Sequence, residues 1–159
     1  MVSSLGNTAL LVVDVQKEFV KGVYTLGIFR QISQYVESHN YSTVIGTVFK
    51  NTVKSNFVKM LDWHKCMHSS KPAVACDKVF EKQGYGLSAD NIEQLRKYSR
   101  VDIVGIDTDA CVMAVAFQLF DAGLNFRILT RYCYSVGGRV LHKAAVTLMR
   151  RNFGKAVVI

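Results

Sequence analysis

Three residues that lie far apart in this sequence have side chains that together could catalyse acyl transfer. Asp14 directly follows the apolar run ALLVV, Lys82 lies in the segment KVFEKQGY, and Cys111 follows a second apolar run within TDACV. A thiolate attacks carbonyl carbon, a carboxylate can accept the thiol proton, and an ammonium group can keep both in their working charge states. These residue types predict a nucleophile, a general base and an electrostatic partner, provided that the fold brings them together.

The position of Cys111 allows two interpretations. Cys111 opens a predicted helix after Gly105, where backbone N–H groups and the positive end of the helix dipole would stabilise a thiolate and lower its pKa. Cysteine is also among the most buried residue types and often fills an apolar gap. Cys66, Cys76 and Cys133 have no comparable surroundings in the sequence, and we expect them to be structural.

Strand-like and helix-like segments alternate along the chain, which predicts an α/β fold: a doubly wound three-layer α/β/α sandwich with a mainly parallel sheet. The expected strands are 8–14, 43–49, 73–76, 101–106, 124–130 and 155–159. The expected helices are 28–38, a short one around 57–61, 88–96, 109–122 and 139–150. Sites in such sheets form beyond the carboxyl ends of the strands, so Asp14 and Cys111 would meet if their strands are neighbours.

The composition predicts one globular domain over residues 1–159. Half of the residues are hydrophobic and 20% are charged, and the single proline and the absence of repeats leave no linker. The apolar runs are far shorter than the roughly 20 residues that span a bilayer, and the N-terminus has no basic signal region. Four cysteines without C-x-x-C spacing favour free thiols in a reducing compartment. We therefore expect a cytoplasmic protein with no membrane partner.

The net charge of +8 reflects 20 basic against 12 acidic residues, an excess that can attract nucleic acid or anionic small molecules. The basic residues are scattered, and no basic run alternates with aromatic residues as a single-strand platform would require. We therefore expect a solvated basic surface, a small-molecule substrate and no nucleic-acid partner.

Four segments match, in order and with fitting spacing, the motifs of one enzyme family. They are ALLVVDVQKEF at 9–19, EKQGY at 81–85, GIDTDACV at 105–112 and SVGGRVLHKAAV at 135–146. Together they resemble the isochorismatase-like cysteine hydrolases, which include nicotinamidases. The resemblance implies a six-stranded sheet of order 3-2-1-4-5-6, a homo-oligomer, and a triad of Asp14, Lys82 and Cys111.

The resemblance also implies a cis peptide at Ile106-Asp107, with the backbone N–H groups of Asp107 and Cys111 forming an oxyanion hole. The implied reaction cleaves a C–N bond of a small amide or carbamoyl compound through a thioester. Phe19 and Tyr85 flank the triad in sequence and are candidates for the substrate pocket, although either could belong to the core. The alternative is a catalytically inactive member that acts as a binding or assembly module.

Two departures from the family pattern affect the expected chemistry. Nicotinamidases have a metal-binding acid and histidines soon after the second strand, whereas this chain reads TVFKNTVKSNF there. His64 and His68 come later and could share a helical face, but we interpret them as a surface pair and expect no metal and no cofactor. Asp107 stands where the family has a small residue, and a carboxylate there would raise the thiol pKa and alter or abolish activity.

Overall fold

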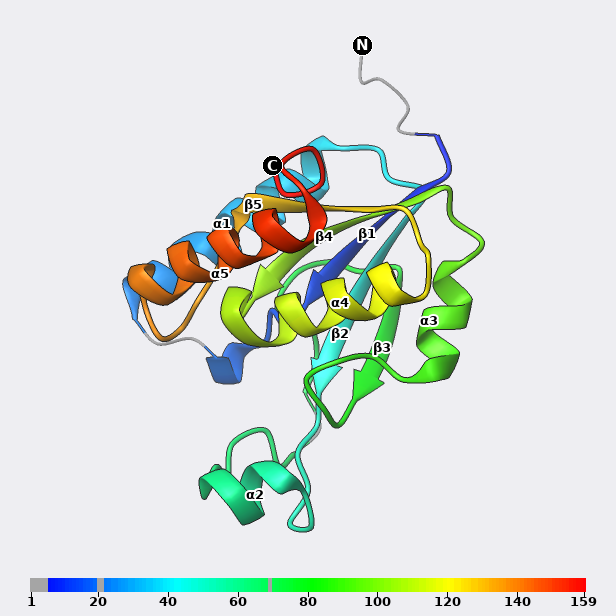
Figure 1. Ribbon diagram of the computed structural model, residues 1–159. Coiled ribbons are helices and arrows are strands. Elements are labelled where there is room, and N and C mark those ends of the chain that lie inside the picture. Colours follow the sequence, from blue (N-terminus) through cyan, green and yellow to red (C-terminus); the bar gives the residue numbers. More distant parts are fainter. Residues whose placement is uncertain (1–5, 20–21, 69) are drawn as a thin grey trace.

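A five-stranded parallel sheet forms the centre of the part of the chain that the computed structural model describes (Figure 1). The described residues are 6–19, 22–68 and 70–159. The strand order is β3-β2-β1-β4-β5, and every neighbouring pair is parallel. The strands are β1 (Thr8–Val13), β2 (Thr43–Phe49), β3 (Lys78–Lys82), β4 (Arg100–Ile106) and β5 (Phe126–Tyr134).

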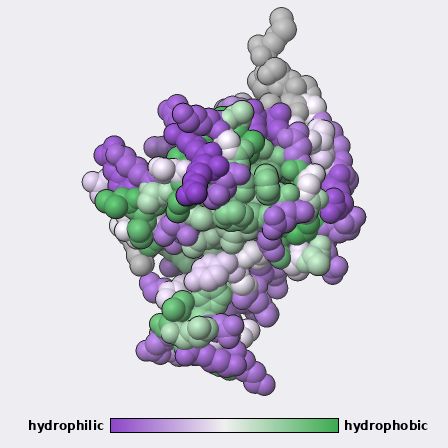
Figure 2. All heavy atoms as spheres, viewed as in Figure 1, coloured by the Kyte–Doolittle hydropathy of each residue, from purple (hydrophilic) through white to green (hydrophobic). Residues whose placement is uncertain are grey.

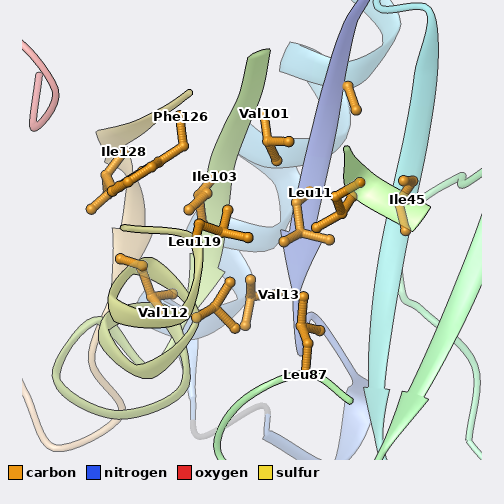
Figure 3. Packing of buried hydrophobic residues seen from close by; sticks show 14 of the residues in the cluster. Leu11, Val13, Ile45, Leu87, Val101, Ile103, Val112, Leu119, Phe126 and Ile128 are labelled. Atoms are coloured by element: carbon orange, nitrogen blue, oxygen red, sulfur yellow. The ribbon is translucent and has the colours of Figure 1, made fainter. Parts of the chain in front are cut away.

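Helices cover both faces of the sheet because successive side chains of a strand point to opposite faces. Leu10 and Val12 of β1 pack in one core cluster with α1, whereas Leu11 and Val13 pack in the other with α4 and α5. Figure 3 presents this second cluster, where Leu119 lies against the sheet. The helices are α1 (Val23–Ser38), α2 (Asn56–Leu61), α3 (Ala89–Leu95), α4 (Met113–Asp121) and α5 (Arg139–Phe153), with short turns η1 (Lys17–Phe19) and η2 (Thr108–Val112).

The predicted three-layer parallel architecture is confirmed, but the predicted sixth strand is wrong for the described residues. After α5 the chain makes a tight turn at Gly154, where the N–H groups of Val157 and Val158 both donate to Gly154 O. These two N–H groups therefore do not pair with β5. What remains of the pairing is a single bridge between Ile128 and Val158. The sheet order therefore ends at β5 instead of continuing to a sixth strand.

The predicted strand at 73–76 is also wrong, because this edge of the sheet is formed by β3 at Lys78–Lys82. The Ala73 N–H bonds to Val15 O, so this segment attaches to the loop after β1 and does not pair along β2. In β3 only Phe80 and Lys82 are buried, as expected for an edge strand with one face covered. Lys82, expected in a loop, is thus the last residue of a strand.

Gly105 allows β4 to lie against β1. Its φ of +125° is a conformation that residues with a side chain rarely adopt, and an added Cβ would overlap the backbone of Val13. The close approach brings the ends of these two strands together. Since Val13 immediately precedes Asp14, Gly105 also helps to place the candidate site.

We predict that Gly105→Ala destabilises the protein by about 3 kcal/mol, because backbone overlap adds to the strain of the positive φ. Urea denaturation followed by circular dichroism measures the change. Gly123→Ala is the matched control: it also has a positive φ, +70°, but no atom within 4 Å of the added Cβ. It should cost about 1 kcal/mol, and equal losses in the two variants would contradict the packing argument.

Candidate active site

Asp14, Lys82 and Cys111 meet at one edge of the sheet. Asp14 follows β1, Lys82 ends β3, and Cys111 lies in η2 just after β4, so three carboxyl ends of parallel strands converge. The Lys82 Nζ lies 2.7 Å from Asp14 Oδ2 and 3.4 Å from Cys111 Sγ. The side chains of Asp14 and Lys82 are each only 1% exposed. The structure therefore places a buried ion pair directly beside a thiol.

Two polar side chains hold the Asp14 loop against β2. The Thr47 hydroxyl donates to Asp14 Oδ1 at 2.6 Å and accepts the Asp14 N–H at 3.0 Å. Gln16 binds both the N–H and the carbonyl of Phe49, at 2.7 and 3.1 Å. These bonds fix Asp14 in a left-handed conformation, φ 50°, which costs a residue with a side chain about 1 kcal/mol. Sequence reasoning missed Thr47, although a hydroxyl within the buried run TVIGTVF was a signal.

Lys82 is enclosed by acceptors. Besides Asp14 and Cys111, its ammonium donates to Gly84 O at 2.8 Å and to Tyr85 O at 3.1 Å. Burial acts to lower the Lys82 pKa, but Asp14 and Cys111 outweigh it, so the pKa is raised and the side chain is charged at neutral pH. An ammonium has three N–H donors for these four partners, and the sulfur is the most distant of them.

The Cys111 thiol has a raised pKa, opposite to the expectation from its position near a helix start. Burial is the main cause, the Asp14 carboxylate raises it further, and Lys82 acts in the other direction. Desolvation and a neighbouring negative charge both disfavour the thiolate. The resting site therefore holds a protonated thiol next to a carboxylate that can accept its proton.

The segment before Cys111 makes an unusual turn. The peptide bond between Ile106 and Asp107 is cis, and in η2, a π-helical turn, the N–H groups of Ala110 and Val112 both bond to Asp107 O. The Asp107 carboxylate accepts the Val136 N–H at 2.7 Å. Asp107 thereby ties the start of η2 to the loop that follows β5, a role that the sequence analysis did not foresee.

A cavity of about 240 Å³ opens above the thiol. Cys111 and Asp107 line it, together with both pocket candidates, Phe19 and Tyr85. Its walls also contain residues that sequence reasoning missed: Glu18, Phe49, Phe57, Leu61, Trp63, Lys65, Ala110, Val136 and Gly137. Phe49, Phe57 and Trp63 come at or after the carboxyl end of β2, which was the available signal. Aromatic and other apolar side chains form most of the lining, and three residues in it are charged, as in sites for small molecules.

The aromatic rings of the wall contact one another. Trp63 stacks on Phe19 with centroids 6.0 Å apart and lies 5.7 Å from Phe49, and Phe57 meets Tyr85 edge to face at 4.8 Å. Such ring pairs contribute roughly 0.5–1.5 kcal/mol each beyond their buried area. The wall is therefore one connected cluster that spans four segments of the chain.

His64 and His68 do not share a helical face, because α2 ends at Leu61 and residues 62–68 are not helical. Asp62 takes a left-handed conformation, φ 51°, and stops the helix. His64 instead bonds to Asp62 at 2.8 Å. Among the described residues, no group of three or more His, Cys, Asp or Glu side chains could hold a metal ion.

The sequence matches the isochorismatase domain family over residues 8–158, and the chain belongs to this family. An isochorismatase-like hydrolase from Alkaliphilus metalliredigens is similar in structure, with a TM-score of 0.75 and 14% identity over 91% of each chain. A pyrazinamidase/nicotinamidase from Streptococcus mutans has a TM-score of 0.73 and 18% identity over 96% of this chain and 99% of that chain.

MAR1 ribonuclease from Caenorhabditis elegans is also similar, with a TM-score of 0.69 and 19% identity over 96% of this chain and 77% of that chain. No curated protein sequence matches the chain. At these identities the structural likeness establishes the fold alone.

In the described part of the chain, no helix combines the length and apolar character needed to span a membrane.

The raised pKa of Cys111 leads to a prediction about its reactivity. Iodoacetamide should modify Cys111 more slowly than a free cysteine at neutral pH, and the rate should increase as the pH rises above the ordinary thiol range, since only the thiolate reacts. Asp14→Asn removes a charge that raises this pKa, so Cys111 should react several-fold faster. Peptide mass spectrometry measures the rate at each cysteine.

Asp62→Asn is the control for this measurement, because Asp62 is an acid with a 96% exposed side chain outside the buried cluster. It should leave the rate at Cys111 unchanged. A rate that stays the same or falls in Asp14→Asn would mean that the Asp14 carboxylate does not raise the pKa of the Cys111 thiol.

Proposed function

We propose that this protein is a cysteine hydrolase that cleaves a C–N bond of a small amide or carbamoyl compound through a thioester. The observation that carries the proposal is the buried contact of Lys82 with both Asp14 and Cys111 beneath an aromatic cavity. Membership of the isochorismatase family supports it, as do structural neighbours named as an isochorismatase-like hydrolase and a nicotinamidase.

In the proposed acylation step, the Asp14 carboxylate takes the Cys111 proton as the sulfur attacks the substrate carbonyl carbon. The backbone N–H groups of Asp107 and Cys111 stabilise the oxyanion. Asp14 then gives the proton to the leaving nitrogen, the C–N bond breaks, and a thioester remains. Concerted proton removal suits a thiol whose pKa is raised, because no thiolate has to accumulate beforehand.

In the proposed second step, Asp14 takes a proton from a water molecule that attacks the thioester carbon. The C–S bond breaks, the proton returns to sulfur, and the carboxylic acid leaves. Lys82 stays protonated throughout, because its raised pKa keeps the ammonium charged. Its role is to compensate the negative charge that passes between Asp14 and Cys111.

We predict that Cys111→Ala lowers turnover at least about 10³-fold, because no other group replaces the sulfur as nucleophile. A screen of small amides, ureides and carbamates, with product detected by ammonia release, measures the loss. Cys76→Ala is the control: Cys76 is half-buried and lies outside the cavity, so full activity is expected. With a slow substrate, intact-protein mass spectrometry should detect an acyl adduct. Peptide mass spectrometry should then locate this adduct at Cys111.

Full activity in Cys111→Ala would contradict the proposal that Cys111 is the nucleophile. A wild-type protein that binds amides in its cavity but turns none over would instead support the non-catalytic alternative, a binding or assembly module. Equilibrium binding to the same compounds, measured by calorimetry, separates these outcomes.

We also propose that the protein forms a homo-oligomer through α4 and α5. Hydrophobic side chains gather over these helices (Figure 2). Phe117, Phe120 and Leu148 are exposed there, as are Val140 and Leu141 at the start of α5. A contiguous apolar face on a soluble protein is typical of an interface. A second copy is the proposed partner.

We predict that Phe120→Lys combined with Leu148→Lys reduces the particle mass measured by light scattering to that of one chain, because two charges would be buried at the interface. Val23→Lys is the control: Val23 is exposed on α1, which covers the other face of the sheet, and this variant should keep the wild-type mass. A monomeric wild type at micromolar concentration would contradict the proposal.

A further inference from the structure

Asn51 is a buried amide that uses its whole hydrogen-bonding capacity. Its Nδ2 donates to Trp63 O at 2.9 Å and to Lys65 O at 3.1 Å. Its Oδ1 accepts the Thr52 N–H at 2.9 Å and the Ser55 hydroxyl at 2.5 Å. An Asn side chain has two donor hydrogens and one oxygen that accepts two bonds, so all four positions are filled. The residue is only 2% exposed.

These four bonds close the segment 51–65 on itself. The Asn51 N–H also bonds to Cys66 O at 2.8 Å, and Ser55 is the N-cap of α2, where its hydroxyl accepts the Val58 N–H. The two ends of the segment and the start of its helix are therefore connected through one side chain. The segment extends away from the sheet (Figure 1), and none of the residues of α2 is buried.

This segment supplies Phe57, Leu61, Trp63 and Lys65 to the wall of the cavity above Cys111. Because none of these four residues is buried, core packing does not determine where they stand. The ring contacts of Trp63 with Phe19 and Phe49 are attractive, but they act on the side chain and do not hold the backbone. The carbonyls of Trp63 and Lys65 are held by directional bonds from Asn51, which fix the backbone of this part of the wall.

We propose that Asn51 is a positioning residue for the substrate cavity: its amide closes the segment 51–65 and thereby fixes Trp63 and Lys65 over Cys111. The part of this inference that concerns turnover rests on the proposed function. The part that concerns the position of Trp63 does not, because it can be measured without a substrate.

The chemistry of the site requires an amide. Aspartate has nearly the same shape and could still accept from Thr52 and Ser55, but it cannot donate to the two carbonyls. Those carbonyls would lose their donor and face a negative charge. Asn51→Asp therefore removes the closing bonds while it keeps the volume of the side chain.

Trp63 is the single tryptophan of the chain, so its fluorescence reports on this segment directly. In Asn51→Asp we expect the acrylamide quenching constant of Trp63 to rise about twofold as the wall opens. We expect KM for the best amide substrate to rise about tenfold, the effect of a loss of about 1.4 kcal/mol in binding. The kcat should stay within about twofold, since Asp14, Lys82 and Cys111 are held by other bonds.

Asn125→Asp is the control, because the Asn125 amide also donates to a backbone carbonyl, Ser99 O at 3.1 Å, but neither residue lines the cavity. It should leave quenching and KM at their wild-type values. If Asn51→Asp does not fold, Asn51→Ser tests the same loss of amide donors with a neutral side chain.

Wild-type quenching of Trp63 in the folded Asn51 variant would overturn the proposal, as would a fall in kcat with KM unchanged. A wild-type protein without turnover would contradict the proposed function and leave the quenching comparison intact. The two failures are therefore distinguishable.

Discussion

The ion pair between Lys82 and Asp14 is the interaction on which the rest of the site depends. Burying two charges is costly, with an effective penalty of several kcal/mol per ion, and the cost is offset only where geometry and further hydrogen bonds are good. Here the pair is 2.7 Å apart, Thr47 binds the carboxylate, and the carbonyls of Gly84 and Tyr85 bind the ammonium. These bonds connect the ends of β1, β2 and β3 with the loop after β3.

After burial, the same pair is the main influence on the charge state of Cys111. Because Asp14 and Lys82 together are neutral, ionising the thiol would leave a net negative charge in a buried site. The position near a helix start suggested a lowered thiol pKa, but desolvation outweighs it. Burial is a property of non-local packing, so the sequence around Cys111 could not reveal it. A thiol that stays protonated reacts slowly with alkylating agents, because the thiolate is the reactive form.

Most of the sheet was predictable because strands buried on both faces read as continuous apolar runs, as in ALLVV of β1. β3 has one buried face and the sequence KVFEK, whose charged residues hide the strand pattern, whereas the apolar residues at 73–76 resemble a strand. Asp14 and Cys111 were placed correctly at strand ends from local sequence. Trp63 and Phe57 were not predicted as cavity residues, because the short helix expected around 57–61 has no buried residue that would indicate where it stands relative to the sheet.

The site thus combines two parts that are held by different forces. The cluster of Asp14, Lys82 and Cys111 is held by the sheet, since each residue sits at or just beyond the end of a strand that is fixed by its neighbours. The wall with Trp63 is held by a segment that extends from the sheet and closes through Asn51. Substitutions in that segment change the shape and charge of the cavity without breaking strand pairing. Substrate choice in such a fold can therefore diverge while the chemical groups stay in place.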